Sequence, residues 1–185
     1  MAIAETEVLT RTSWEFDPAH TLIEFSAKHM MVTTVRGRFV GFHGSIHGDA
    51  NDPENAQIDV EIDASTLDTR NEQRDGHLRS ADFLDVENFP TLTYHSTHIE
   101  KVSDDRLRVT GDLTVKDVTK PVTLDATING FGTTPWGQEV AGITLEGQIN
   151  RKDFGLIWNV ALETGGVLVG DTIKIAIEIE AIKQA

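Results

Sequence analysis

The 185-residue sequence contains no cysteine and no apolar run that approaches 18 residues. Without thiols the chain cannot form disulfides, ligate an iron–sulfur cluster or use a cysteine nucleophile. Without a long apolar run, no segment is expected to span a bilayer as a helix. The first residues include Glu5 and Glu7 and lack an apolar core segment, so we expect no secretory signal and a cytoplasmic protein.

Basic residues are also scarce. The chain has 16 Lys and Arg against 30 Asp and Glu, a formal net charge of −14. This balance disfavours nucleic acid or an anionic membrane surface as the main partner. Hydrophobic residues make up 39% and charged residues 25%, which is ordinary for a globular protein. The length fits one domain, and we expect it over residues 14–185, preceded by an N-terminal extension of residues 1–13.

Apolar and polar residues alternate with a period of two along most of the chain. In one segment Ile58, Val60 and Ile62 alternate with Asp59 and Glu61. This pattern predicts strands that are buried on one face and solvated on the other. The expected strands are 20–30, 35–48, 57–64, 91–100, 106–115, 122–129, 139–150 and 173–180.

The links between most of these segments are short and rich in turn residues, which predicts antiparallel neighbours. Eight one-sided strands leave no room for a layer of helices. Closing the sheet buries the apolar face and removes the open edges. The sequence therefore predicts an all-β fold, a closed eight-stranded antiparallel lipocalin-like barrel. A two-sheet sandwich is the main alternative.

Three places interrupt the alternation. Phe39 and Phe42 have opposite parity, which predicts a bulge near Gly41 or Gly44. The charged segment 65–90 predicts a short helical insertion. The segment 151–171 predicts a long connection, and connections of this length are usually functional or lid-like.

Motifs of catalysis and cofactor binding are missing. The sequence has no G-x-S-x-G and no P-loop, and its GGVLVG run at 165–170 opens no helix. His43 and His47 would lie roughly 13 Å apart on a strand. His95 and His98 differ in parity and are expected on opposite faces. We therefore expect no metal site and no cofactor.

The inward positions of the predicted barrel are apolar and include several small residues, among them Ala27, Gly111, Ala126 and Gly147. Small residues on many strands predict an apolar cavity, which suits a long hydrocarbon. The alternative is a core filled by Phe25, Phe39, Phe42 and Tyr94. The residues expected to contact the hydrocarbon are Ile23, Phe25, Ala27, Phe39, Phe42, Val60, Ile62, Leu92, Tyr94, Val109, Leu113, Leu124, Ala126, Ile143, Leu145 and Ile175.

The segment 70–79 gathers Arg70, Arg74, His77 and Arg79 in an otherwise acidic chain. These residues either pair with nearby aspartates in a surface loop or recognise the polar head of a ligand. We expect the insertion to close one mouth of the barrel. The candidate head-group and mouth residues are Arg74, His77, Phe83, Leu84, Phe154 and Trp158.

Five segments together resemble the YceI-like family of polyisoprenoid-binding, lipocalin-like proteins. They are FDPAH at 16–20, KHMMV at 28–32, RDGHLRSADF at 74–83, GDLTV at 111–115 and NRKDFG at 150–155. The resemblance implies a closed barrel with a helical insertion and an extended apolar pore. It also implies a bound isoprenoid lipid, such as a polyprenyl phosphate or a quinone tail, and no catalysis.

We therefore predict a protein that carries or sequesters an isoprenoid or another long-chain amphiphile. A homodimer is compatible with the sequence. Two alternatives stay open. One is an enzyme that acts on an isoprenoid or quinone through His29 or His77, and the other is a filled barrel that serves as a stress-response or interaction module.

Overall fold

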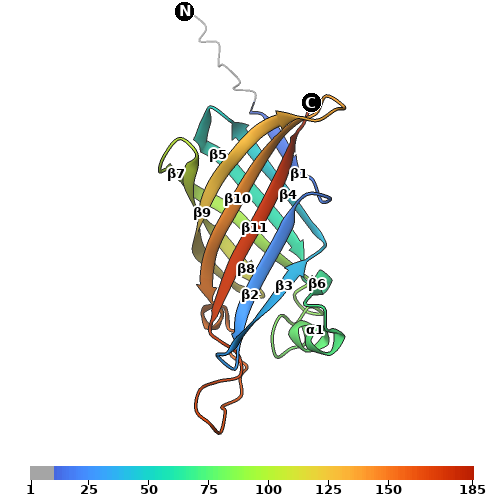
Figure 1. The fold of residues 1–185 in the computed structure, drawn as a ribbon, viewed down its shortest axis with the longest axis vertical. Coiled ribbons are helices and arrows are strands. Elements are labelled where there is room, and N and C mark those ends of the chain that lie inside the picture. The colour runs from blue at the N-terminus through green and yellow to red at the C-terminus, as the bar shows by residue number, and fades with distance from the viewer. Residues whose placement is uncertain (1–10) are drawn as a thin grey trace, which may run out of the picture.

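The computed structural model describes residues 11–185, and long strands run obliquely around an elongated barrel (Figure 1). Of the expected extension 1–13, residues 1–10 lie outside the described part. The strands are β1 (Ser13–Phe16), β2 (Leu22–His29), β3 (Thr33–Phe39), β4 (Phe42–Asp49), β5 (Asp52–Asp63), β6 (Leu67–Asp68), β7 (Thr91–Lys101), β8 (Arg106–Val115), β9 (Val118–Thr133), β10 (Glu139–Asn150) and β11 (Thr172–Lys183).

The sheet closes on itself through β1, which pairs with β4 on one side and with the last strand, β11, on the other. β11 also pairs with β2, and β2 pairs with β3. β1 and β2 together form one interrupted strand, and so do β3 and β4. With these two, the barrel has eight antiparallel strands, which confirms the predicted closed barrel and excludes the sandwich.

The interruption between β3 and β4 falls at Val40 and Gly41. There the amide of Gly41 donates to the Thr66 hydroxyl at 2.9 Å instead of joining the ladder. Instead of the bulge expected near Gly41 or Gly44, the chain breaks the strand at Val40 and Gly41, and Gly44 pairs regularly within β4. The strand β1 was not expected, because four residues are too short for a recognisable alternation.

The insertion between β5 and β7 contains a 3-10 turn (Ala64–Thr66), β6 and the helix α1 (Glu72–Arg79), which confirms the expected short helix. Asn71 caps α1, since its side chain accepts from the amide of Arg74 at 2.9 Å. Glu72 in the first turn complements the helix dipole. The insertion lies beside β3 (Figure 1).

The two ends of the barrel differ (Figure 1). The lower end carries the β2–β3 turn, the insertion and the connection 151–171, which includes a second 3-10 turn (Arg151–Phe154). The upper end carries the turns β4–β5, β7–β8 and β9–β10. The first and last strands also meet at the upper end, where the amide of Gln184 donates to the carbonyl of Ser13 at 2.8 Å.

One expectation about the histidines is wrong. The pairing of β7 with β8 shifts register between Ser96 and His98, so the alternation of β7 changes phase there. His95 and His98 are consequently both exposed on the outside of the barrel. The bulge restores Ile99 to the core, where it is 4% exposed.

Candidate functional site: an apolar cavity and a covered mouth

An apolar cavity of about 80 Å³ lies inside the upper half of the barrel. Its wall includes Val109, Ala126, Ile143 and Leu145, four of the residues expected to contact a hydrocarbon. The other lining residues are Trp14, Ile46, Gly48, Asp49, Ala50, Pro53, Ala56, Ile58, Ile99, Leu107, Ile128, Phe131, Ala141, Ile179 and Ala181. The volume is below the roughly 300–1,000 Å³ of most small-molecule sites.

The remaining expected residues fill the rest of the barrel. Ile23, Phe39, Leu92 and Leu124 are buried in the single hydrophobic core. Seven further residues pack against that core while only partly buried, namely Phe25, Phe42, Val60, Ile62, Tyr94, Leu113 and Ile175. Ala27, near the lower end of β2, is half-buried and lies outside this cluster.

The inward glycines do not leave empty space, contrary to what their size predicts. A Cβ atom on Gly111 would lie 2.5 Å from Cζ of Tyr94, and one on Gly147 would lie 2.5 Å from a methyl carbon of Leu124. A neighbouring side chain therefore occupies the room at each glycine. The ring of Tyr94 crosses β8, and its hydroxyl donates to the carbonyl of Val122 on β9 at 3.1 Å. Burial raises the pKa of Tyr94 to about 12.

Two aromatic residues absent from the predicted set help to line the cavity. Trp14 on β1 is buried, and Phe131, near the β9–β10 turn, is more than half exposed. Their ring centroids lie 6.2 Å apart. The alternation of Trp14 and Phe16 with polar residues could have indicated a strand, but four residues are too few for the pattern to be distinctive. Phe131 lies in β9 between Gly130 and Gly132, just beyond a register shift in the pairing with β10, so alternation carries little information there.

The lower mouth brings three of its six predicted residues into contact. The ring of His77 on α1 meets Phe83 edge-on, with centroids 5.1 Å apart, and meets Trp158 edge-on at 4.5 Å. His77 Nε2 also lies 2.8 Å from a carboxylate oxygen of Asp82. The insertion and the connection 151–171 are thus joined by aromatic contacts between residues more than seventy positions apart in the chain.

Leu84 and Phe154, two further mouth residues, are buried in the hydrophobic core. Leu67 from β6 is buried beside them in the same cluster. Apolar side chains from the insertion and from the connection 151–171 therefore cover the lower end of the barrel.

Arg74, the sixth mouth residue, is held inside the insertion. Its Nε donates to the hydroxyl of Thr69 at 2.7 Å, and its guanidinium also donates to the carbonyl of Thr69 at 2.8 Å. The buried Asp75 accepts from the amide of Thr69 at 3.0 Å. Arg79 similarly donates to the carbonyls of Ser65 and Leu67. Each of the two guanidinium groups thus makes two hydrogen bonds to the loop that precedes α1.

Arg151 organises the long connection at the lower end. Its side chain is buried, and it donates to the carbonyls of Leu156, Trp158, Val169 and Gly170 at 2.6–3.3 Å. Burial lowers its pKa from the ordinary value of arginine. These bonds fix both halves of the connection and hold the backbone of Trp158 next to His77.

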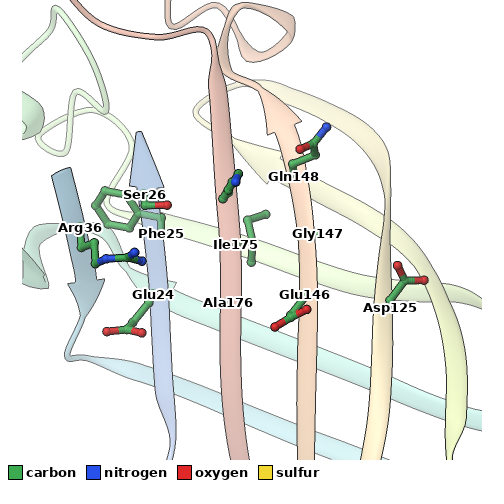
Figure 2. Close-up of a pocket in the computed structure, with 11 residues that line it drawn as sticks. Glu24, Phe25, Ser26, Arg36, Asp125, Glu146, Gly147, Gln148, Ile175 and Ala176 are labelled. Atoms are coloured by element: carbon green, nitrogen blue, oxygen red, sulfur yellow. The ribbon is translucent and has the colours of Figure 1, made fainter. Parts of the chain in front are cut away.

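A larger hollow of about 470 Å³ lies on the outside of the sheet, over β2, β10 and β11 (Figure 2). Small residues lie among the longer ones that line the hollow, namely Ser26, Ala176 and Gly147. The long side chains at its border are Glu24, Arg36, Asp125, Glu146, Gln148 and Lys174. Phe25 and Ile175, two of the residues expected to contact a hydrocarbon, also line this hollow. Because six long polar or charged side chains border it, the almost wholly apolar cavity inside the barrel is the better candidate for a hydrocarbon chain.

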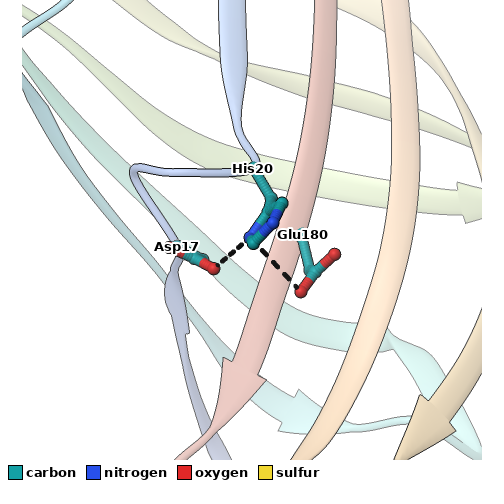
Figure 3. A group of neighbouring side chains, drawn as sticks. All are labelled: Asp17, His20 and Glu180. Carbon is teal, nitrogen blue, oxygen red and sulfur yellow. Dashed lines mark hydrogen bonds and ion pairs between the residues drawn. The ribbon is translucent and has the colours of Figure 1, made fainter. Parts of the chain in front are cut away.

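A polar cluster connects the β1–β2 turn to β11 (Figure 3). His20 Nδ1 lies 2.6 Å from Asp17 Oδ2 and 3.8 Å from Glu180 Oε1. The ligand atoms of these three side chains all lie within 4.8 Å of one another, and residues 11–185 contain no other such group of three potential metal ligands. The hydrogen bond to Asp17 raises the pKa of His20, and the same bond lowers the pKa of Asp17. Sequence patterns could not bring Glu180 into this cluster, since it is 160 residues away from His20.

The closed antiparallel barrel, the helical insertion and the apolar interior define a lipocalin-like β-barrel protein. The profile of the YceI-like domain matches residues 14–181, and the chain belongs to this family. The UPF0312 protein SA2479 of Staphylococcus aureus strain N315 is 38% identical over 164 residues, which cover 88% of this chain and 93% of that protein. The resemblance found in the sequence is thereby confirmed.

Solved structures share the fold. The YceI protein of Campylobacter jejuni is 32% identical with a TM-score of 0.75, and the match covers 85% of this chain and 90% of that one. A structure described as a polyisoprenoid binding domain from Saccharophagus degradans, implicated in plant cell wall breakdown, matches with a TM-score of 0.68 at 13% identity, over 92% and 98% of the two chains. Within the described part of this chain, no helix is long and apolar enough to cross a membrane.

Proposed function

We propose that this protein binds a long-chain lipid of isoprenoid type in its barrel and carries or sequesters it without chemical conversion. The observation that supports the proposal most directly is the cavity, whose wall is almost entirely apolar and lies inside a closed barrel. Such a wall solvates a hydrocarbon and offers nothing to a charged group. The described binding of polyisoprenoid by a protein of the same fold points in the same direction.

The chain end of the lipid would occupy this cavity, with the rest of the chain along the barrel axis toward the lower mouth. A cavity of about 80 Å³ holds only a small part of a long chain. Binding would therefore displace side chains that now fill the barrel. Partly buried residues such as Leu113 and Ile175 would be displaced.

The polar head would lie at the lower mouth, near His77 and Trp158. An uncharged head, such as a quinone ring or a polyprenol hydroxyl, fits this mouth better than a phosphate. Arg74 and Arg79 already donate to Thr69, Ser65 and Leu67, so a phosphate would compete for donors that hold the insertion together. His77 and Trp158 offer a polar edge beside aromatic surface.

Mass spectrometry of an organic extract of the purified protein tests the proposal. We expect a stoichiometric isoprenoid lipid. Two variants that fill the cavity, Ala126→Phe and Ala141→Leu, should lose it, while the outward substitution Asp125→Leu should retain it. Thermal unfolding of each variant shows which of them are folded.

An extract without lipid, together with no saturable uptake of added polyprenol by the lipid-free protein, would favour the filled barrel. Recovery of a chemically converted lipid, lost in His77→Ala or His29→Ala, would show an enzyme instead.

A further inference from the structure

We propose that the lower end of the barrel docks on the surface of a zwitterionic lipid bilayer through exposed apolar residues of two neighbouring segments, the β2–β3 turn and the connection 151–171. These residues, the apolar tips, are Met30, Met31, Val32, Ile157 and Val160. Their exposed fractions run from 44% to 75%. The inference rests on the proposed lipid binding, because a lipid carrier must meet the bilayer that supplies or receives its ligand.

Backbone hydrogen bonds hold the two segments together. The amide of Met30, in the β2–β3 turn, donates to the carbonyl of Leu168 at 2.8 Å. The amide of Leu168 in turn donates to the carbonyl of Val160 at 3.0 Å, and His29 forms an isolated bridge with Val169. Arg151 fixes the connection from behind. The apolar tips therefore form one surface on an ordered support.

The β2–β3 turn places apolar side chains where the backbone disfavours them. Met30 and Met31 have φ values of 52° and 60°, in the left-handed region. Tight hairpin turns with this conformation usually use Asn and Gly. A non-glycine residue there carries a local cost, and such costs often mark functional positions. Packing in the core does not offset this cost, since both side chains are exposed.

The charge distribution identifies the surface that fits this end. The lower-end segments 28–38, 64–90, 116–120 and 151–174 hold eleven Lys and Arg and ten Asp and Glu. The rest of residues 11–185 holds five Lys and Arg and eighteen Asp and Glu, so most of the excess acidic charge lies outside the segments that carry the apolar tips. A zwitterionic bilayer has no net charge to repel the acidic body, whereas an anionic bilayer would repel it.

The shape also favours a bilayer. The β2–β3 turn and the connection 151–171 project from the lower end of the barrel (Figure 1). Met30, Met31 and Val32 lie at the end of the β2–β3 hairpin. Ile157 and Val160 lie on the first arm of the connection, before its turn at 162–166. A fluid interface can receive projecting apolar side chains without a matching pocket. The large exposed apolar surface of this end is thereby accounted for.

Flotation with phosphatidylcholine vesicles tests the docking. The variant Met30→Asn/Met31→Gly supplies the residues that the turn prefers, so it should be at least as stable as the parent protein. We expect it to lose vesicle binding at least tenfold, and Val32→Ser/Ile157→Ser to do the same. The matched control Val102→Ser/Trp136→Ser removes exposed apolar residues from the upper end and should bind as the parent does.

Vesicles containing phosphatidylglycerol should bind less at low salt, and the difference should shrink at high salt. Unchanged binding of both tip variants would overturn the proposal, as would stronger binding to the anionic vesicles. It would also be overturned if light scattering showed that the parent is a dimer and the tip variants are monomers, because the tips would then bind a second copy.

The lipid content of the same samples separates this inference from the proposed function. Tip variants that keep their co-purified lipid but lose vesicle binding support both. A parent protein that contains no lipid and takes up none, yet docks through the tips, would contradict only the proposed function.

Discussion

The phenol ring of Tyr94 lies over Gly111 of the neighbouring strand, so close that a Cβ atom at residue 111 would sit 2.5 Å from Cζ. Gly111→Ala should therefore destabilise the protein by about 1–3 kcal/mol through overpacking. Gly132→Ala is the control, because the nearest atom to its new Cβ would be 3.7 Å away. Chemical denaturation measures both, and equal losses would show that the ring of Tyr94 moves aside freely.

Alkaline titration should reveal the burial of the same tyrosine. Its folded-state pKa, about 12, lies above its ordinary value of 10.0, so the neutral phenol is favoured in the folded protein. The corresponding stability is fully present below pH 10 and is lost as the pH rises toward 12. Tyr94→Phe should flatten this decline in the free energy of unfolding. A parallel decline in the two proteins would mean that other groups cause it.

Substitutions on adjacent residues of β5 should differ in cost. Val60→Asp places a carboxylate against the hydrophobic core, which should cost several kcal/mol. Asp59→Val removes the contact of Asp59 with His95 on the outside of the barrel, a pair with 2.6 Å between its atoms. An exposed pair of this kind is worth at most about 1 kcal/mol. Urea denaturation distinguishes the two, and the reverse order would show that the strand faces the other way.

Arg74→Ala should loosen the insertion. It removes both hydrogen bonds to Thr69, and we expect a loss of about 1–3 kcal/mol. Gln73→Ala, on the exposed face of the same helix, should change stability little. Binding of polyprenyl phosphate and of the matching polyprenol should fall together. A selective loss of the phosphate, at unchanged melting temperature, would instead assign Arg74 to the head group.

Proton titration should show coupling between His20 and Asp17. The pKa of His20 is raised above 6.5 and that of Asp17 is lowered below 3.8. The contribution of His20 to stability is present below pH 6.5 and is lost as the pH rises through its folded-state pKa. That of Asp17 is present above pH 3.8 and is lost in acid. Asp17→Asn should lower the pKa of His20 in an NMR titration, and an unchanged value would exclude the pair in solution.

Alternation along the strands was enough to predict the barrel, because each strand is long and buried on one face. The same rule could not give the phase change in β7, since a bulge adds a residue without changing the composition around it. It also missed β1, whose four residues join the two ends of the sheet. Closure therefore depends on an element that alternation does not reveal.

The candidate site was predicted less completely, for two physical reasons. Residue size does not reveal cavity size, because Tyr94 and Leu124 fill the space that Gly111 and Gly147 leave. The positive charge of a residue also does not reveal whether its hydrogen-bond donors are free to bind a ligand, because Arg74 donates two hydrogen bonds to Thr69. The aromatic mouth residues were more predictable. Buried rings in long breaks of a small barrel have few places to pack except over its ends.

The pairing of β1 with β11 has a consequence for biosynthesis. Trp14 lies opposite Lys183, so the first strand of the barrel cannot pair with β11 and close the sheet until β11 has left the ribosome. Contacts this distant along the chain also slow folding. Until β11 is in place, the edges of β10 and β2 stay open, and the nascent chain exposes strand edges on which aggregation can begin. A version of the gene truncated before residue 172 should therefore yield insoluble protein, whereas a circular permutant that links the end of β11 to the start of β1 and opens the chain at the β7–β8 turn should still fold.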